Sequence, residues 1–232
     1  MFYLFGSLAL LILFLIAIYI RKDLAKQGLF SGVAFMIYGP LSEIIYFQDY
    51  WQPQAVLPQL NIAGYTFFFE DFIFAFSIVG VMSIAYDFFF DKSTEEKIFP
   101  RQIVLAITLS ILCMVSFILG FIFTNINSIF LSMGISIFFA SIVIWIRKDL
   151  LKTSLVSCLI CGFGGIVFYF IILLLPGATD YLVDVWHLSL DEAAFWFLGI
   201  PLPITELLWA SSMPLYFSII YKFGAGSGYK NS

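Results

Sequence analysis

Seven long apolar runs, separated by short polar segments, dominate the chain. Each run is close to the roughly 20 residues that an α-helix needs to cross a lipid bilayer. We therefore predict an all-α polytopic membrane protein with seven transmembrane helices. The predicted helices cover residues 2–20, 29–47, 65–90, 103–124, 129–146, 154–175 and 196–221.

The composition excludes most other classes of protein. Hydrophobic residues make up 62% of the 232 residues, compared with roughly 45–50% in a soluble domain. Charged residues make up 11%, which is too small a share to cover the surface of a soluble fold. The net charge of −4 and the lack of a basic stripe exclude nucleic acid as a partner. The high hydrophobicity also excludes a disordered chain.

The positive charges follow the first, third, fifth and seventh predicted helices, and none of the eleven Lys and Arg residues lies within a predicted helix. If successive helices alternate in direction, these cations lie on one side, which the positive-inside rule identifies as cytoplasmic. We therefore expect an external N-terminus and a cytoplasmic C-terminus in a multi-pass protein of a prokaryotic plasma membrane. The first apolar run has no cations before it, so we expect a retained helix rather than a cleaved signal peptide.

Two parts of the sequence resemble each other. The segment Ile-Arg-Lys-Asp-Leu at 20–24 recurs at 146–150, and the Asp-x-Trp at 49–51 recurs at 184–186. We refer to the shift that aligns residue 20 with residue 146 as the first offset, and to the shift that aligns residue 49 with residue 184 as the second offset. Each offset aligns further identical residues. Apolar bias explains matches of Ile and Phe, but it does not explain these charged and Trp-containing motifs.

The matching segments divide the chain into two copies of a three-helix unit. Three helices reverse the direction of the chain and one linking helix restores it, so the two copies run in parallel around a pseudo-two-fold axis along the membrane normal. We expect a site between the copies. The predicted parts are residues 1–90 for the first copy, 91–128 for the linking loop and fourth helix, 129–223 for the second copy and 224–232 for a cytoplasmic tail.

Acidic side chains within apolar helices are costly, and they are functional candidates by default. Glu43 lies near the outer end of the second predicted helix, Glu70 and Asp71 lie in the third, and Glu206 lies in the seventh. The second offset places Glu70 and Asp71 at the depth of Thr205 and Glu206. With no Lys or Arg at that depth, such carboxyl groups tend to stay protonated and can donate a proton. A purely structural role for these acids is the alternative.

Aromatic side chains accompany these acids. Phe68 precedes Glu70 and Trp209 follows Glu206, and aromatic faces can stabilise a carbocation. Ordinary packing is the favoured interpretation, because Phe occurs throughout this chain. Trp51 and Trp186 lie in the outer loops, where Trp commonly anchors a protein at the lipid headgroups.

Other chemistries lack their residues. Cys113, Cys158 and Cys161 lie in apolar runs, and His187 is the single histidine, so we expect no metal site. No phosphate-binding loop or dinucleotide-binding motif occurs, so we expect no nucleotide cofactor. The seventh predicted helix has no Lys in its middle, which excludes a retinal Schiff base.

The acids and aromatics form a recognisable pattern: an acid near the end of a helix, a Trp about eight residues later, then a Pro-x-Glu-Glu motif before an aromatic-rich helix. With this pattern, the chain resembles the small, non-flavin, integral-membrane lycopene cyclase domains over nearly its whole length. Glu43 and Trp51 match the acid and the Trp of the first copy. In the second copy, Trp186 matches the Trp and Asp180 is a looser match to the acid. Residues 68–71 and 203–206 stand at the two Pro-x-Glu-Glu positions.

Three positions depart from the motif: Phe68 replaces the Pro, Asp71 replaces a Glu and Thr205 replaces another Glu. The resemblance implies a redox-neutral cyclisation without a cofactor. A carboxylic acid protonates the terminal double bond of a linear carotenoid, the carbocation closes a six-membered ring, and a carboxylate removes a proton. Implied partners are a lycopene-like polyene, the bilayer and other carotenoid enzymes. Implied catalytic residues are Glu70, Asp71 and Glu206, with Glu43, Phe68, Thr205, Pro203, Trp209, Trp51 and Trp186 in supporting roles.

Two alternatives belong to other classes. Small-solute transporters of the SWEET type share the arrangement of three, one and three helices, but the predicted helices here offer few polar residues to bind a hydrophilic solute. A non-catalytic carotenoid- or lipid-binding relative of the cyclases is compatible with the altered motifs. An assay of cyclase activity separates the lycopene cyclase from the non-catalytic relative, and an assay of solute uptake tests the transporter.

Overall fold

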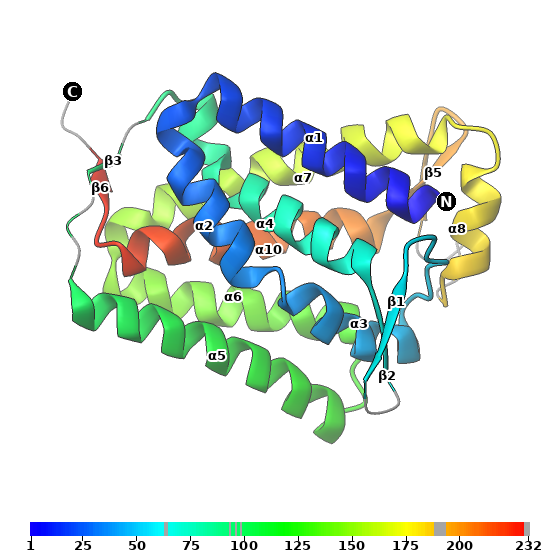
Figure 1. Ribbon diagram of the computed structural model, residues 1–232, viewed down its shortest axis with the longest axis horizontal. Coiled ribbons are helices and arrows are strands. Elements are labelled where there is room, and N and C mark those ends of the chain that lie inside the picture. Colours follow the sequence, from blue (N-terminus) through cyan, green and yellow to red (C-terminus); the bar gives the residue numbers. More distant parts are fainter. Residues whose placement is uncertain (63–64, 93, 96, 98, 188–193, 230–232) are drawn as a thin grey trace.

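The computed structural model describes residues 1–62, 65–92, 94–95, 97, 99–187 and 194–229, and most of them are helical (Figure 1). Five of the described helices are long and apolar enough to cross a membrane. They are α1 (Phe2–Ile20), α4 (Phe69–Phe89), α5 (Pro100–Phe123), α6 (Ser128–Ile146) and α7 (Leu151–Leu173), the last preceded by the 3-10 turn Lys148–Leu150. The chain is therefore a mostly helical protein with several helices that suit a membrane.

The second predicted helix, 29–47, is broken rather than straight. Helix α2 (Ala25–Phe35) and helix α3 (Tyr38–Asp49) meet at a 48° bend, and the pair together is a sixth candidate for a membrane span. Pro40 explains the break, because its ring would clash with the carbonyl group of Met36, four residues earlier, in a continuous helix. Pro40 lies in the first turn of α3, where the missing N–H group leaves no helical hydrogen bond unmade.

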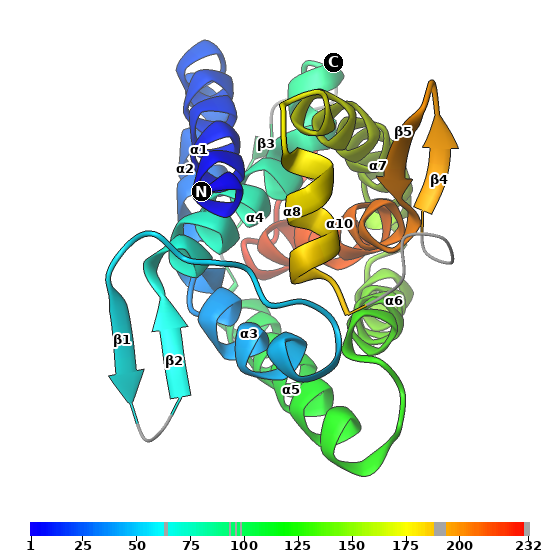
Figure 2. The same cartoon turned by 90° about the vertical axis from the view of Figure 1, so that its right-hand side faces the viewer.

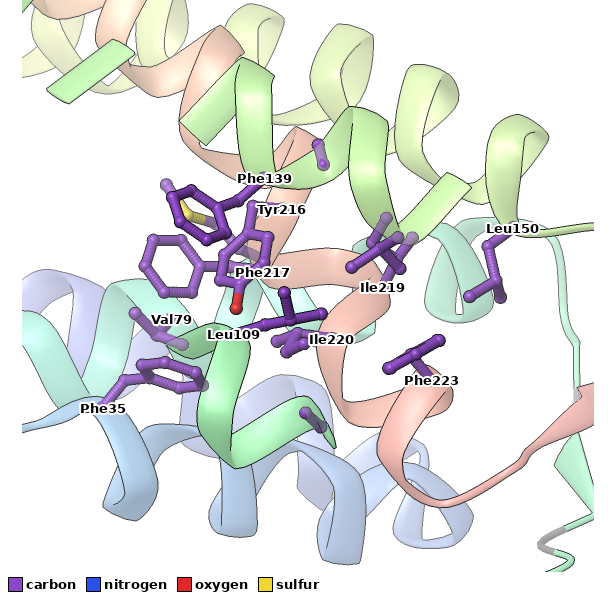
Figure 3. Packing of buried hydrophobic residues seen from close by; sticks show 14 residues of the cluster. Phe35, Val79, Leu109, Phe139, Leu150, Tyr216, Phe217, Ile219, Ile220 and Phe223 are labelled. Atoms are coloured by element: carbon purple, nitrogen blue, oxygen red, sulfur yellow. The ribbon is translucent and has the colours of Figure 1, made fainter. Parts of the chain in front are cut away.

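Helix α10 (Ile204–Gly224) lies in the middle of the bundle, where it packs against α4, α5, α6 and α7. It is not among the candidate membrane spans of the described chain. Buried residues in its C-terminal half, including Tyr216, Phe217 and Ile220, form a hydrophobic cluster with Phe35 of α2 and Phe139 of α6 (Figure 3). The neighbouring helices thus bury α10, so this helix does not need an unbroken apolar surface of its own.

Two β-hairpins correct the predicted starts of the third and seventh helices. Strand β1 (Gln59–Ile62) pairs with β2 (Tyr65–Phe68) immediately before α4. Strand β4 (Ala194–Phe197) pairs with β5 (Ile200–Pro203) immediately before α10. Short runs of aromatic and β-branched residues suit a strand as well as a helix, so hydrophobicity alone could not separate the two. The hairpins lie on opposite sides of α8 (Ala178–Val185) in Figure 2.

The bounds of the elements in the two halves coincide under the two offsets. The first offset aligns both ends of α1 with both ends of α6. It also aligns both ends of the 3-10 turn Lys22–Leu24 with those of the 3-10 turn Lys148–Leu150. The second offset places both ends of β1, β2 and α4 on those of β4, β5 and α10. Helix α4 packs against α1 and α2, and α10 packs against α6 and α7. In each half, one helix thus packs against the two long helical segments before it.

Arginine side chains link several segments at the end of the molecule that lies opposite the N-terminus and the two hairpins. Arg21 donates hydrogen bonds to the carbonyl oxygens of Asp87 (3.1 Å) and Lys92 (3.0 Å), and Arg147 donates to that of Ser227 (2.9 Å). Near this end, Thr94–Glu95 (β3) pairs with Gly228–Tyr229 (β6). Figure 1 shows β3 and β6 at one end and the N-terminus, α8 and the hairpins at the other.

Lys222 corrects the expectation that every cation lies outside a helix. Helix α10 continues past Tyr221 to Gly224, so Lys222 lies within it and is only 1% exposed. Its Nζ atom lies 2.7 Å from a carboxylate oxygen of Asp87, which is also buried. A buried cation needs a partner of opposite charge, and Asp87 provides it.

Candidate functional site

Two adjoining cavities, of about 110 and 100 Å³, lie inside the helical bundle. The first lies mainly among α1, α3, α7, α8 and α10, and the second lies among α2 to α6 and α10. Four side chains line both: Glu43, Tyr46, Phe74 and Trp209. Because they share this wall, we treat the cavities as consecutive parts of one tract.

Two carboxyl groups line the first cavity. Glu43 of α3 is 5% exposed, and its Oε2 atom accepts a hydrogen bond from the Trp51 indole at 2.9 Å. Glu206 lies in the first turn of α10, and its Oε1 atom accepts a hydrogen bond from the Tyr50 hydroxyl at 2.5 Å. Tyr169 and Trp186 also lie within hydrogen-bonding reach of Glu206. Asp71 and Glu206 both lie close enough to Glu43 for the charges to interact, Asp71 the more strongly.

The loops that follow α3 and α8 meet over this cavity. Trp51 and Trp186 form an antiparallel bridge, and the N–H group of His187 donates to the carbonyl oxygen of Tyr50 at 2.9 Å. Trp186 is 7% exposed, and both Trp side chains line the cavity. The expectation of two separate headgroup anchors is therefore wrong for Trp186, because pairing between the loops buries its ring.

Tyr50 connects several of these groups. It is 2% exposed, and its ring lies 5.9 Å from that of Tyr46 and 6.0 Å from that of Trp186, measured between centroids. Its hydroxyl oxygen lies 3.2 Å from Oγ1 of Thr205, in addition to the bond to Glu206. Thr205 thus helps to fix the donor of Glu206 instead of supplying a further carboxylate.

Glu70 and Asp71 are fully buried, but neither lines the two cavities. The Oε1 atom of Glu70 accepts the backbone N–H groups of residues 56 and 57, each at 2.7 Å, and ties the loop before β1 to α4. Asp71 accepts hydrogen bonds from the Tyr3 hydroxyl (2.7 Å) and from the N–H group of Phe68 (3.3 Å). Tyr3 lines the first cavity, so Asp71 reaches it through that hydroxyl.

The remaining predicted residues shape the surroundings. Pro203 is buried and directly precedes α10, so it fixes the entry of the chain into the helix that carries Glu206. Trp209 stacks on Phe74 of α4, with ring centroids 6.1 Å apart and an angle of 27° between the planes. Phe68 packs against Phe47 of α3, away from the acids, at 5.3 Å between centroids.

Neutral groups hold the acids of this site. Within the described ranges, no Lys or Arg forms an ion pair with Glu43, Glu70, Asp71 or Glu206. Hydroxyl, indole and backbone N–H donors take that place. Such donors stabilise a carboxylate less strongly than a cation does, so the group can exchange a proton more readily. Over the same described ranges, no cluster of three or more His, Cys, Asp and Glu is placed to hold a metal ion.

Sequence reasoning missed three tyrosines: Tyr3, Tyr50 and Tyr169. A signal for two of them was present. Tyr50 is the middle residue of the Asp-x-Trp motif, and the first offset aligns Glu43 with Tyr169. Tyr3 has no such signal, because its partner Asp71 is 68 residues away.

No family model, curated protein or solved structure matches this chain. The fold and the site define a class by themselves: a protein of apolar helices, several of them suited to a membrane, that encloses two carboxyl groups in an aromatic cavity.

Proposed function

We propose that this chain is a lycopene cyclase-like isomerase of carotenoid biosynthesis, embedded in a prokaryotic plasma membrane. The observation that carries the proposal is the pair Glu43 and Glu206, two acids that line one aromatic cavity and form no ion pair within the described ranges. A second, mostly apolar cavity shares four lining side chains with the first, and it offers space for part of a hydrocarbon chain. An aromatic and apolar lining also favours a polyene over a hydrophilic solute.

The proposed reaction is an acid–base cyclisation. One carboxylic acid adds a proton to the terminal double bond of the linear end group. A neighbouring double bond attacks the resulting carbocation and closes a six-membered ring, and a carboxylate then removes one proton. Atoms and electrons balance without an oxidant or reductant. A positioned acid or base typically contributes a factor of about 10²–10⁴ to such a step.

We propose roles that differ from the sequence-based ones for Glu43 and Glu70. Glu206 and Glu43 are the proposed acid and base, because both line the cavity. Asp71 is the proposed helper, acting on the cavity through the Tyr3 hydroxyl. Glu70 is proposed to position the loop before β1 through its two backbone N–H partners. The aromatic side chains stabilise the positive charge that develops on the substrate.

We also propose seven membrane spans in two parallel copies, with α2 and α3 as one bent span, α5 as the linking helix and α10 as the seventh span. The constant offsets between the bounds of the two halves support the copies. Residues that the second offset aligns also meet, because Trp51 bridges Trp186 and Asp87 pairs with Lys222. Residues near a pseudo-two-fold axis are expected to meet their own equivalents in this way.

Close helix contacts support the same proposal. A Cβ atom on Gly39 would lie 2.7 Å from Cβ of Ala75, and one on Gly165 would lie 3.0 Å from Cβ of Ala210. The first offset aligns the two glycines, and the second offset aligns the two alanines. Small residues let helices approach closely in membranes, and here they do so at corresponding places.

The proposed orientation puts the end with Arg21 and Arg147 on the cytoplasmic side, by the positive-inside rule. The N-terminus and the carboxyl groups then lie toward the outer side. A hydrocarbon substrate reaches this site from within the bilayer, and we propose that other carotenoid enzymes deliver and accept it there.

Pigment analysis tests the function. The chain is expressed in bacteria that accumulate lycopene, beside Glu206→Gln, Glu43→Gln and the control Asp149→Asn, which changes an exposed acid at the other end. We expect cyclised carotenoid from the unaltered chain and the control, and none from the Glu variants. Unchanged lycopene, with the unaltered protein present in the membrane, would contradict the proposal. Solute uptake would then test a SWEET-like transporter, and retention of pigment would test a non-catalytic binding protein.

A further inference from the structure

The first cavity is unusually aromatic. Eleven of its 21 lining residues are Phe, Tyr or Trp, whereas these residues make up 20% of the chain. Three of the five Trp residues, Trp51, Trp186 and Trp209, contribute to it. Aromatic rings have negative faces that attract a cation, and Trp does so most strongly.

The charged groups of the cavity have one sign. Glu43 and Glu206 are its acids, and no Lys, Arg or His lines it among the described residues. Both acids line the same cavity, and neither forms an ion pair with a Lys or Arg within the described ranges. A positive charge in the cavity would provide a partner for these acids.

The hydroxyl oxygen of Tyr181 and Nε1 of Trp209 also belong to the lining and make no hydrogen bond of good geometry in the described part of the chain. Their nearest polar neighbours are the backbone at Gln54 and Tyr3 for Tyr181 and the Tyr46 side chain for Trp209. The Trp209 N–H group can only donate, so it marks polar space in the cavity and not the position of a cation. Trp209 also borders the second cavity, so an occupant can extend from one cavity to the other.

We propose that the first cavity binds an organic monocation, namely an alkylated ammonium group whose apolar chain lies in the second cavity. The aromatic rings surround the charge, one carboxylate of Glu43 and Glu206 neutralises it, and the second cavity takes the chain. An alkylated ammonium suits this site because it interacts through its methyl groups with ring faces and needs few hydrogen-bond acceptors. The inference uses the site of the proposed function, but it does not depend on catalysis.

The same chemistry has two sources. A lipid with a quaternary ammonium headgroup carries a permanent charge on an apolar chain. A carbocation formed during cyclisation carries the same charge for a short time, and a stable ammonium then resembles the transition state, which an enzyme binds more tightly than its substrate. The test separates these sources.

Binding is measured on the full chain in maltoside micelles, which carry neither charge nor ammonium. The probe is hexyltrimethylammonium, and its neutral match is 2,2-dimethyloctane, in which carbon replaces the nitrogen. Fluorescence of the cavity Trp residues reports occupancy. We expect saturable binding of the cation at least tenfold tighter than that of the neutral match. Equal affinity of the two would overturn the inference without the need for any variant.

Variants locate the binding site. Glu43→Gln and Glu206→Gln should each weaken binding of the cation at least fivefold and leave binding of the neutral match unchanged. Asp149→Asn should change neither affinity. Unaltered affinity for the cation in both Glu variants would also overturn the inference. Thermal unfolding without the probe shows whether each variant is folded.

Competition and inhibition assign the source. Displacement of the probe by phosphatidylcholine, but not by phosphatidylglycerol, identifies a lipid headgroup. Inhibition of cyclisation by the probe, without displacement by phosphatidylcholine, identifies the carbocation. Cyclisation without binding of the ammonium refutes this inference and leaves the proposed function standing. Binding without cyclisation refutes the proposed function alone.

Discussion

The two ends of the molecule hold their buried acids in different ways. One end carries the buried ion pair of Asp87 and Lys222, and we call it the ion-pair end. There, a carboxylate oxygen of Asp87 lies 2.7 Å from the ammonium of Lys222, and the carboxylate also accepts a hydrogen bond from Gln27 at 3.2 Å. The other end carries the first cavity with Glu43 and Glu206, and we call it the carboxyl site. There, Glu43 accepts a hydrogen bond from an indole and Glu206 accepts one from a phenol. The first arrangement pairs the acid with a cation. The second provides neutral hydrogen-bond donors instead.

The contrast separates structural acids from reactive ones. A carboxylate beside a buried cation stays ionised, because protonation would leave that cation unpaired at a cost of several kcal/mol. A carboxyl group among neutral donors in an apolar cavity exchanges its proton at a lower cost. Both kinds appear in the sequence simply as acids within apolar runs, and only their partners distinguish them.

The largest expected effect is at the carboxyl site. Glu206→Gln keeps the size of the side chain but removes its proton chemistry. We expect cyclisation to fall by about 10²–10⁴, the usual contribution of a positioned acid or base, with little change in thermal stability. Product formation per amount of membrane protein measures it. More than a tenth of the activity in this variant would show that the carboxyl group is not needed.

At the ion-pair end, Lys222→Met leaves Asp87 buried without its cation. We expect a loss of about 3–5 kcal/mol in unfolding free energy, measured by denaturant titration in micelles. Adding Asp87→Leu to this variant should recover most of the loss, because both charges are then gone. If the double variant is as unstable as the single one, the loss does not come from the unpaired charge of Asp87, and this explanation is wrong.

Close packing, rather than charge, should stabilise the helices beside the carboxyl site. A Cβ atom on Gly39 would clash with the carbonyl oxygen of Asp71, whereas one on Gly134 would meet nothing within 4 Å. We expect Gly39→Ala to destabilise the protein by about 1–3 kcal/mol through overpacking. Gly134→Ala is the matched control, and equal stability of the two variants would refute the close contact.

The smallest effect concerns exposed ion pairs. Arg147 pairs with Asp149, whose side chain is 54% exposed. Asp149→Asn should cost at most about 1 kcal/mol, because water and salt screen such pairs. Unfolding at low and high salt measures it. A loss as large as that of Lys222→Met would mean that burial does not distinguish the pairs at this end.

The sequence predicted the helices well where apolar runs are long. The run at 2–20 is α1 without change, and the runs at 129–146 and 103–124 end within a few residues of α6 and α5. The hairpins were missed, because Tyr-Thr-Phe-Phe at 65–68 is compatible with either structure. The bend at Met36 agrees with the helix-breaking effect of Pro40, which the sequence shows.

The site was predictable in kind but not in detail. Glu206 was identified because an acid in an apolar helix is costly. The preference for Glu70 over Glu43 came from motif position, and nothing in the sequence shows that backbone N–H groups 14 and 13 residues away occupy Glu70. Burial of Lys222 depends on Asp87, which lies in the other half of the chain, and contacts at such a separation form only in the folded chain.

Solvent isotope incorporation tests the central claim most directly. Membranes that contain the protein are supplied with unlabelled lycopene in deuterated water, and the products are analysed by mass spectrometry. If a carboxylic acid that exchanges with solvent starts the reaction, each ring should gain about one mass unit, and Glu206→Gln membranes should form no labelled product. A cyclised product without deuterium, or equal labelling in the Glu206→Gln variant, would contradict proton-initiated cyclisation at this site.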